Sequence, residues 1–171
     1  MLDCGVCIVR LFRTDDAEEL QAIANDPEIA RTLRDLFPNP YTLDDARAWI
    51  ALNARDDATN FLIEVDGVPG GAVGYTRFDA ERRCTAETGY WIARKFWGRG
   101  IATAALKAVA GLAFERDDIV RLEAGVYSNN PASMRVLEKC GYVCEGIMRD
   151  AVIKNGQLLD AHLYARLYDQ L

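Results

Sequence analysis

Basic residues, histidine and long apolar runs are all scarce in this sequence. The 171 residues include 20 Lys and Arg against 26 Asp and Glu, a formal net charge of −6. The positive surface of a nucleic-acid-binding protein is therefore missing, and a cationic or amine-bearing partner is favoured. No apolar stretch approaches the ~20 residues that span a bilayer, and the first residues lack the features of a signal peptide. We expect a cytoplasmic protein that binds neither nucleic acid nor membrane.

Disulfide and metal chemistry also have little support. Five cysteines are an odd number without the spacing of a small disulfide-rich domain, which indicates reduced thiols. The C-x-x-C pair of Cys4 and Cys7 precedes the strand-like run CIVRLF rather than a helix, so no helix dipole lowers a thiol pKa there. Neither a second such pair nor a group of histidines accompanies it, so we expect no metal site. The single histidine, His162, is interpreted as structural rather than catalytic.

Strand-length and helix-length segments alternate along the chain in a mixed order. Hydrophobic alternation predicts a first strand at Val6–Phe12, and Asp66-Gly67 and Asn155-Gly156 predict hairpin turns between later strands. Further strands are expected at residues 60–67, 68–79, 84–93, 118–128, 142–153 and 157–168. Helices are expected after the caps Thr14 and Thr42, from Pro27 onwards, and over residues 102–114 and 132–140, with Gly141 closing the last one.

This order predicts a single domain, residues 1–171, of the α+β class (an α/β sandwich). The middle strands are joined by turns too short for crossovers, which excludes a doubly wound sheet. We expect a central mixed, mostly antiparallel, twisted sheet of about seven strands, flanked by four or so helices. The chain is long enough for one compact core, since half of its residues are hydrophobic.

The stretch WGRGIATAAL carries the clearest chemical signal. Gly98 and Gly100 form a tight bend between a strand and an alanine-rich helix. The first N–H groups of a helix have no intrahelical acceptor, and the helix dipole adds positive charge, so this turn can bind an anion. Lys95 and Arg99 favour phosphate over a carboxylate. Taken alone, a G-x-G turn before a helix fits a purely structural turn equally well.

A second helix start follows in SNNPASMRVLEKCGY. Asn130 and Ser133 would line a cleft beside the glycine turn if the two preceding strands are neighbours, although both residue types are also common helix caps. The dinucleotide and P-loop patterns fit poorly, because Thr103 stands where a third glycine would be and no G-K-[ST] follows.

The segments GYWIARKFWGRGIATAAL, NNPASMRVLEKCGY and CEGIMRDAVIKNG resemble, in order and spacing, the GNAT N-acetyltransferase superfamily. The resemblance is specifically to its subgroup of ribosomal-protein N-terminal (alanine or serine) acetyltransferases, and it extends from the IVRLF strand to the LYARL strand. It implies a GNAT-like sheet with splayed central strands, and acetyl-coenzyme A as the donor with coenzyme A as product. The cofactor-binding residues that it implies are Ile92, Ala93, Phe96, Trp97, Gly98, Arg99, Gly100, Ile101, Ala102, Asn130 and Ser133.

Two positions depart from the family pattern. Lys95 stands where the phosphate turn often begins with Gln or Arg, and Leu137 stands where many members have the tyrosine that protonates the leaving thiolate. The resemblance then implies Ser133 as the proton donor, with Tyr127 as the alternative. Because a serine hydroxyl is a poor acid, a relay or water-assisted role is expected for it.

The resemblance also implies a base. Glu87 matches the acidic residue that is thought to deprotonate the amine in this subgroup, and it lies on the strand that leads into the glycine turn; a solvated or salt-bridged glutamate is the competing interpretation. Glu64 and Glu123 are lesser candidates. An α-amine has a pKa near 7.7–8.0, so about 10 % is neutral at pH 7 and a weakly basic carboxylate acting through water would suffice.

The function expected is acetyl transfer from acetyl-coenzyme A to a primary amine by direct attack in a ternary complex. The acceptor could be a peptide N-terminus, a polyamine or a small-molecule amine, since acceptor pockets are built from variable loops. A non-catalytic acyl-coenzyme A-binding regulatory module is the main alternative, and an unrelated nucleotide-binding domain is a third. The protein is expected to be a monomer or a homodimer.

Overall fold

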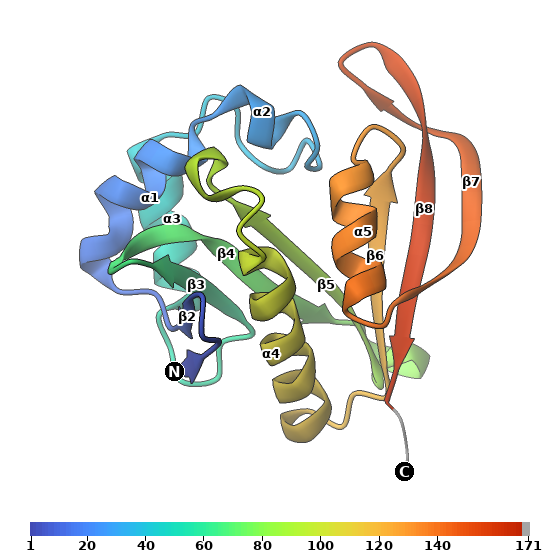
Figure 1. Ribbon diagram of the computed structural model, residues 1–171, viewed down its shortest axis with the longest axis horizontal. Helices are drawn as coiled ribbons and strands as arrows, with labels where there is room; N and C mark the ends of the chain where they lie inside the picture. The colour runs from blue at the N-terminus through green and yellow to red at the C-terminus, as the bar shows by residue number, and fades with distance from the viewer. Residues whose placement is uncertain (169–171) are drawn as a thin grey trace. The chain divides into compact units, whose positions relative to one another are not determined.

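The computed structural model describes residues 1–168 as an α+β protein (Figure 1). Its strands are β1 Leu2–Asp3, β2 Ile8–Arg10, β3 Asn60–Val65, β4 Val68–Arg77, β5 Thr85–Ile92, β6 Arg121–Tyr127, β7 Val143–Lys154 and β8 Gln157–Leu167. Its α-helices are α1 Ala17–Ala24, α2 Pro27–Ala30, α3 Leu43–Asn53, α4 Ile101–Arg116 and α5 Pro131–Lys139. Short 3-10 helices cover Thr14–Asp16, Ala80–Arg82 and Arg94–Phe96.

The strands form one mixed sheet in the order β1-β2-β3-β4-β5-β6-β8-β7. β5 and β6 run parallel, whereas β1–β2, β2–β3, β3–β4, β6–β8 and β7–β8 are antiparallel. The predicted class is therefore confirmed, with eight strands in residues 1–168 rather than about seven. The parallel register covers only Thr85–Glu87 of β5 and Arg121–Glu123 of β6, in agreement with the expected splaying of the central strands.

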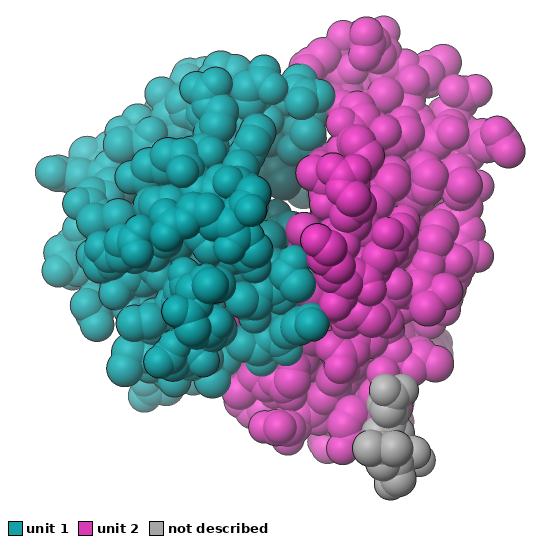
Figure 2. Space-filling view, in the orientation of Figure 1, with its two compact units in different colours: residues 1–74, 90–108 teal, residues 75–89, 109–171 magenta. Residues whose placement is uncertain are grey.

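The chain divides into two compact units (Figure 2). Unit 1 consists of residues 1–74 and 90–108, and unit 2 of residues 75–89 together with the chain from residue 109 onwards. Both β4 and β5 pass from one unit into the other, and so does α4. The glycine turn belongs to unit 1, whereas Glu87 and α5 belong to unit 2.

Unit 1 is built around one apolar cluster. Leu20 of α1, Ile50 of α3 and Leu62 of β3 are at most 2 % exposed and share this cluster with Phe12 and Tyr41. α1 begins after the 3-10 turn, and α3 begins with the predicted cap, in which Thr42 accepts a hydrogen bond from the Asp45 N–H and Asp45 bonds back. Such reciprocal capping satisfies two N–H groups that the helix leaves without partners.

The N-terminal segment differs from the prediction of one strand at Val6–Phe12. Residues 2–3 and 8–10 instead form the antiparallel hairpin β1–β2, with Cys4 to Cys7 as its turn. Gly5 has a φ of 76° in this turn, a conformation that glycine adopts without steric cost. Of the predicted strand only Ile8–Arg10 is paired as β2, and its pairing with Leu2 and Asp3 cannot be predicted from the alternation within a single segment.

The predicted cap at Thr14 is also wrong, because Asp16 rather than Thr14 accepts the hydrogen bonds in this segment. Its carboxylate accepts hydrogen bonds from both Nη atoms of Arg10, at 2.7 and 2.8 Å, and from the Arg13 N–H at 2.7 Å. Arg10 also donates from Nε to Glu64 at 2.6 Å. Arg10 and Asp16 are each 6 % exposed, so this is a buried charge cluster that ties β2 to β3 and to the start of α1.

The Asp16 carboxyl should make stability depend on acid pH. Burial would raise its pKa, but the guanidinium of Arg10 and the Arg13 N–H hold that pKa below its ordinary value of 3.8. The stability that Asp16 contributes is therefore present above about pH 4 and is lost as pH falls through the pKa of the folded state. We expect Asp16→Asn to lower the free energy of unfolding by about 2 kcal/mol at pH 7, and the difference from wild type to shrink below pH 4. Urea unfolding from pH 2.5 to 7 measures this, with Asp15→Asn as the control; a difference that does not vary with pH would contradict it.

Unit 2 contains the C-terminal strands and α5. β8 pairs with β6 on one side, from Arg121↔Leu167 to Tyr127↔Ala161, and with β7 on the other. The predicted turn between β7 and β8 is confirmed, with Asn155 and Gly156 both at positive φ. α5 follows β6 in the chain (Figure 1) and ends at Lys139; Gly141 then adopts a φ of 82°, and the Tyr142 N–H is bonded to the carbonyl of Leu137.

Candidate functional site

The glycine turn connects β5 to α4 within unit 1. After the 3-10 helix Arg94–Phe96, Gly98 and Gly100 adopt φ values of 75° and 77°, and α4 begins at Ile101, one residue earlier than predicted. A side chain at either glycine would meet no atom within 4 Å, so the turn is open to solvent and glycine is needed there for conformation. The predicted glycine turn before a helix N-terminus is therefore present, and anion binding there stays a prediction.

Aromatic residues hold this turn in place. Phe96 is buried, and the Nζ of Lys95 and the Cζ of Arg99 lie 4.9 and 5.3 Å from its ring centroid. Trp97 is half exposed, and its indole Nε1 donates a 2.7 Å hydrogen bond to the carbonyl of Ile92. The turn is thus bonded back to the end of β5, and two cations lie beside it.

The end of β5 is more fully bonded than the resemblance implied. The Ala93 N–H donates to the carbonyl of Gly70 at 2.8 Å, and the Ala93 carbonyl accepts from the Phe96 N–H at 2.9 Å. Because the Ile92 carbonyl accepts from Trp97, cofactor contacts of these two residues would have to use the Ile92 N–H or a second lone pair of a carbonyl.

Gly71 is a residue that the sequence analysis missed. A Cβ atom on Gly71 would lie 2.2 Å from the carbonyl oxygen of Trp91, and its φ is 153°. β4 and β5 therefore approach each other here more closely than a side chain would permit, directly before the glycine turn. The signal was the Gly70-Gly71 pair inside a strand, since glycine in a strand interior often marks a close backbone approach.

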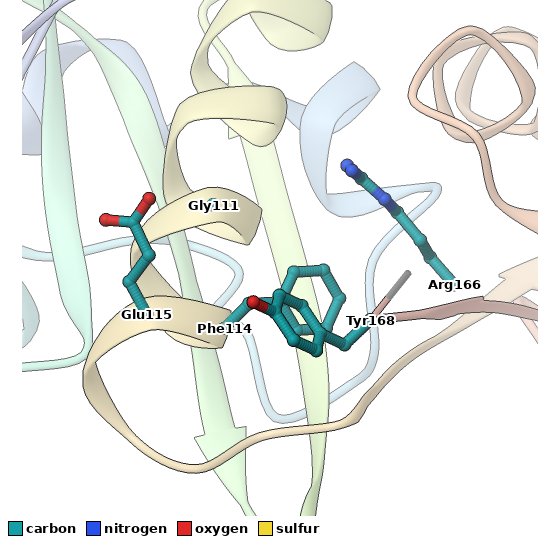
Figure 3. A pocket seen from close by; sticks show the side chains of 5 residues that line it. All are labelled: Gly111, Phe114, Glu115, Arg166 and Tyr168. Carbon is teal, nitrogen blue, oxygen red and sulfur yellow. The ribbon is translucent and has the colours of Figure 1, made fainter. Parts of the chain in front are cut away.

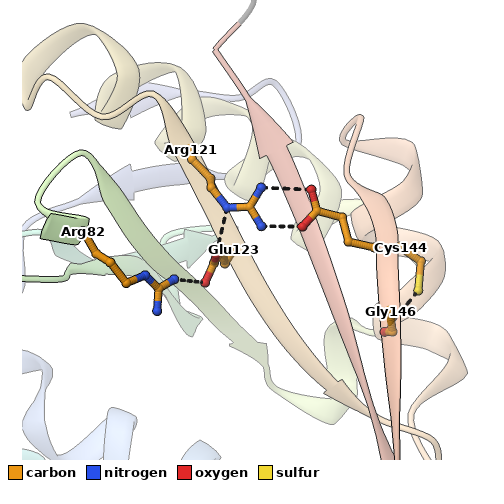
Figure 4. A network of polar contacts seen from close by, with 6 residues as sticks. Arg82, Arg121, Glu123, Cys144 and Gly146 are labelled. Atoms are coloured by element: carbon orange, nitrogen blue, oxygen red, sulfur yellow. Dashed lines mark hydrogen bonds and ion pairs between the residues drawn. The ribbon is translucent and has the colours of Figure 1, made fainter.

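The catalytic candidates lie in unit 2. Glu87 is half-buried on β5, where its register partner on β6 is Glu123. Glu123 accepts from Arg82 at 2.5 Å and from Arg121 at 2.7 Å (Figure 4). Burial would raise its pKa, but these two guanidinium groups hold the pKa of the Glu123 carboxyl below its ordinary value. A carboxylate stabilised in this way is a weak base, so Glu123 is a poor candidate for that role.

Figure 4 also shows how this network reaches β7. Arg121 donates to both carboxylate oxygens of Glu145, through Nη1 at 2.9 Å and through Nη2. Glu145 lies at an irregularity in the β7–β8 register between Cys144 and Gly146. Glu64, the other lesser candidate, is bonded to Arg10 in unit 1 and is likewise engaged with an arginine.

Asn130 and Ser133 occupy the start of α5, as predicted. The side-chain oxygen of Asn130 accepts from the Ser133 N–H at 3.2 Å, which makes Asn130 the N-cap of α5. Tyr127 ends β6, and its carbonyl accepts from the Asn130 N–H at 2.9 Å. The capping interpretation of Asn130 is therefore confirmed, and because the cap uses only the amide oxygen it is compatible with a cofactor contact through the amide nitrogen.

Leu137 lies in a helix, the single histidine in a strand and the C-x-x-C pair in a hairpin turn. Leu137 is fully buried in α5, so it contributes to the core where many relatives have a tyrosine. His162 lies within β8, paired with Val126 of β6 and Ile147 of β7. Burial raises the pKa of the Cys4 thiol, and it raises the pKa of the Cys7 thiol to about 12. Both are poor nucleophiles, as the sequence indicated.

A surface pocket of about 210 Å³ lies in unit 2 (Figure 3). The Phe114 and Tyr168 rings pack with centroids 5.5 Å apart, and the Arg166 guanidinium lies 5.5 Å from the Phe114 centroid. Gly111 and Glu115 complete the lining, which contains none of the predicted site residues.

In residues 1–168 no helix is long and apolar enough to cross a membrane. The same residues contain no group of three or more His, Cys, Asp or Glu side chains that could hold a metal ion.

Comparison with known proteins identifies the family. Residues 7–143 match the model described as "Acetyltransferase (GNAT) domain". A putative ribosomal N-acetyltransferase of Bacillus subtilis is 32 % identical over 166 residues, covering 93 % of this chain and 90 % of the relative. The crystal structure of a GNAT-family acetyltransferase from Bacillus anthracis has a TM-score of 0.84 at 23 % identity, covering 97 % of each chain. A ribosomal L7/L12 α-N-protein acetyltransferase in complex with coenzyme A has a TM-score of 0.83 at 21 % identity, covering 96 % of each chain.

The family model spans most of the chain, and the relatives are aligned over nearly their full length. The glycine turn and the start of α5 at Asn130 lie in two of the segments on which the resemblance was based, GYWIARKFWGRGIATAAL and NNPASMRVLEKCGY. The chain belongs to the GNAT acetyltransferase family, whose members transfer an acetyl group from acetyl-coenzyme A.

Proposed function

We propose that this chain, acting as one catalytic domain over residues 1–171, acetylates the α-amine of a protein or peptide N-terminus. The observation that carries the proposal is the open glycine turn at the start of α4, which has two positive-φ glycines and the cations of Lys95 and Arg99 beside it. The similarity to a putative ribosomal N-acetyltransferase and to a ribosomal L7/L12 α-N-protein acetyltransferase supports the acceptor class. A polyamine or small-molecule amine remains the alternative acceptor.

The residues present fit acetyl-coenzyme A. A Cβ atom built on Gly98 or Gly100 meets nothing within 4 Å, so the backbone of the turn is accessible to a bulky anion. Residues 96–102 would hold the pyrophosphate through backbone N–H groups, and Asn130 would contact the cofactor from the start of α5. When bound, the thioester supplies an activated acetyl group to the amine.

The protein supplies the proton transfers. Glu87 takes a proton from the ammonium form of the amine, through a water molecule, so that the nitrogen can attack the acetyl carbon. The Ile92 N–H would donate to the acetyl carbonyl oxygen as charge develops there. The C–N bond would form and the C–S bond would break, and Ser133, with Tyr127 as the alternative, would relay the second proton lost by the nitrogen to the departing thiolate.

A matched pair of glycine variants tests cofactor binding. Gly100→Val is expected to weaken coenzyme A binding at least tenfold, because a branched side chain cannot keep the 77° φ and its methyl groups obstruct the turn. Gly156→Val is the control: Gly156 has a φ of 76° with nothing within 4 Å, but it lies in the β7–β8 turn. Calorimetry measures affinity, and free-thiol release measures turnover on N-terminal peptides and small amines.

The outcomes separate the alternatives. If the wild-type protein does not bind coenzyme A, or if both glycine variants bind it equally well, the cofactor assignment is wrong. Tight binding without turnover on any amine would favour the non-catalytic acyl-coenzyme A-binding module, for which the buried Leu137 is the motivating observation. Turnover on small amines but not on N-terminal peptides would overturn the acceptor class alone.

A further inference from the structure

An acidic side chain contacts the arginine of the cofactor turn. Asp66 lies in the β3–β4 hairpin, and its Oδ2 accepts from both Nη1 and Nη2 of Arg99 at 3.1 Å. Asp66 and Arg99 are 68 % and 46 % exposed. Both belong to unit 1, and Arg99 stands between Gly98 and Gly100.

The fold does not require a carboxylate at this position. Asp66 has a φ of 53° and is followed by Gly67 at 82°, as in a two-residue hairpin turn. Asn-Gly forms such a turn at least as well as Asp-Gly, so asparagine would preserve the backbone. An exposed ion pair also contributes little to stability. The negative charge of Asp66 therefore has its main effect on what the Arg99 guanidinium can bind.

Carboxylate and phosphate use the same donors of arginine. A guanidinium presents its N–H groups in a planar fork, and either anion can accept from two of them. In this structure the fork of Arg99 is directed at one oxygen of Asp66. A phosphate brought to the glycine turn would meet an arginine that is already paired and a fixed negative charge beside it.

We propose that Asp66 acts as a surrogate anion for Arg99 and lowers the affinity of the turn for phosphate-bearing ligands. Asp66 holds the arginine beside the turn in the free protein and gives it up when the pyrophosphate of coenzyme A binds. Asp66 is a positioning residue that lowers the affinity for coenzyme A, and it thereby makes release of the coenzyme A product easier. This inference rests on the proposed function, because it requires coenzyme A at the glycine turn.

The test measures the affinity for coenzyme A by calorimetry in Asp66→Asn, in Asp66→Asn combined with Arg99→Gln, and in Asp57→Asn. Asp66→Asn is expected to bind coenzyme A about three- to fivefold more tightly than wild type at low ionic strength, the range that an exposed ion pair can account for, and the gain should shrink as salt is added. In an Arg99→Gln background, Asp66→Asn should raise the affinity for coenzyme A much less, because only the general effect of removing one negative charge is left. Pantetheine, which lacks phosphate, should bind wild type and Asp66→Asn with equal affinity.

Asp57→Asn is the matched control. Asp57 is an exposed unit 1 aspartate that pairs with Arg55 at 3.0 Å, so this variant makes the same charge change at a similar ion pair. An equal gain from Asp57→Asn would show that net charge alone is responsible and would overturn the inference. So would unchanged or weaker coenzyme A binding by Asp66→Asn in a protein whose wild type binds it. If wild type does not bind coenzyme A, the proposed function and the inference both fail.

Discussion

Glutamine in place of Glu87 is expected to lower kcat about a hundredfold at pH 7, with the KM for acetyl-coenzyme A nearly unchanged. General-base catalysis contributes about 10²- to 10⁴-fold, and the lower end applies because part of an α-amine is already neutral at pH 7. Glu87 is half-buried on β5, opposite Glu123 in the register with β6. Initial rates of thiol release at saturating donor and N-terminal peptide measure the effect.

The pH profile distinguishes a base from a structural glutamate. Above pH 8 most of an α-amine is neutral, so the deficit of Glu87→Gln should decrease as pH rises. Glu123→Gln is the control, because this carboxylate is engaged with Arg82 and Arg121, and its loss should affect the free energy of unfolding more than kcat. A rate deficit that is independent of pH, or one carried by Glu123→Gln instead, would refute the assignment of Glu87 as the base.

Alanine in place of Gly71 is expected to lower the free energy of unfolding by about 2–4 kcal/mol. The added Cβ would lie 2.2 Å from the carbonyl oxygen of Trp91 and 3.0 Å from the Cα of Ile92, both backbone atoms of β5. Because backbone atoms cannot rotate away as a flexible side chain can, β4 and β5 must separate at the point where β5 leads into the glycine turn. Coenzyme A affinity should therefore fall together with stability, and urea unfolding and calorimetry measure the two effects.

Gly125→Ala provides the comparison for Gly71→Ala. Gly125 also lies within a strand, β6, but a Cβ there meets nothing within 4 Å and its φ is not in the positive region. Replacing it should change the free energy of unfolding by less than about 1 kcal/mol. If both alanine variants are equally stable, the close approach of β4 and β5 is not a requirement of the fold.

Local signals in the sequence predicted the elements that depend on neighbouring residues. The cap at Thr42 with Asp45, the proline start of α2 and the turns at Asp66-Gly67 and Asn155-Gly156 are confirmed. Each of these features is determined within about four residues, so a short stretch of sequence contains all the groups that form it. The glycine turn before α4 belongs to the same class.

The features that the sequence did not reveal depend on residues far apart in the chain. Asp16 rather than Thr14 accepts the hydrogen bonds at the start of this helical segment, because it also pairs with Arg10, which is itself shared with Glu64. The Asp66–Arg99 pair joins positions 33 residues apart. The strand alternation around Glu87 gave no sign that Glu123, its neighbour on β6, is neutralised by two arginines. Spacing along the chain does not predict which charges meet across a sheet.

The position of β8 has a consequence for the order in which unit 2 assembles. β7 precedes β8 in the chain, yet β8 lies between β6 and β7 in the sheet. During synthesis β7 therefore emerges without its sheet neighbour, and Val143 and Ile153, which stay about two-thirds exposed in the folded structure, have no strand to pair with until β8 follows. Pairing of β6 with β8 closes a longer loop than the β7–β8 hairpin does, so the hairpin can form first and dock as a unit. The last strand to be made is in this way the one that joins the edge of the sheet to its centre.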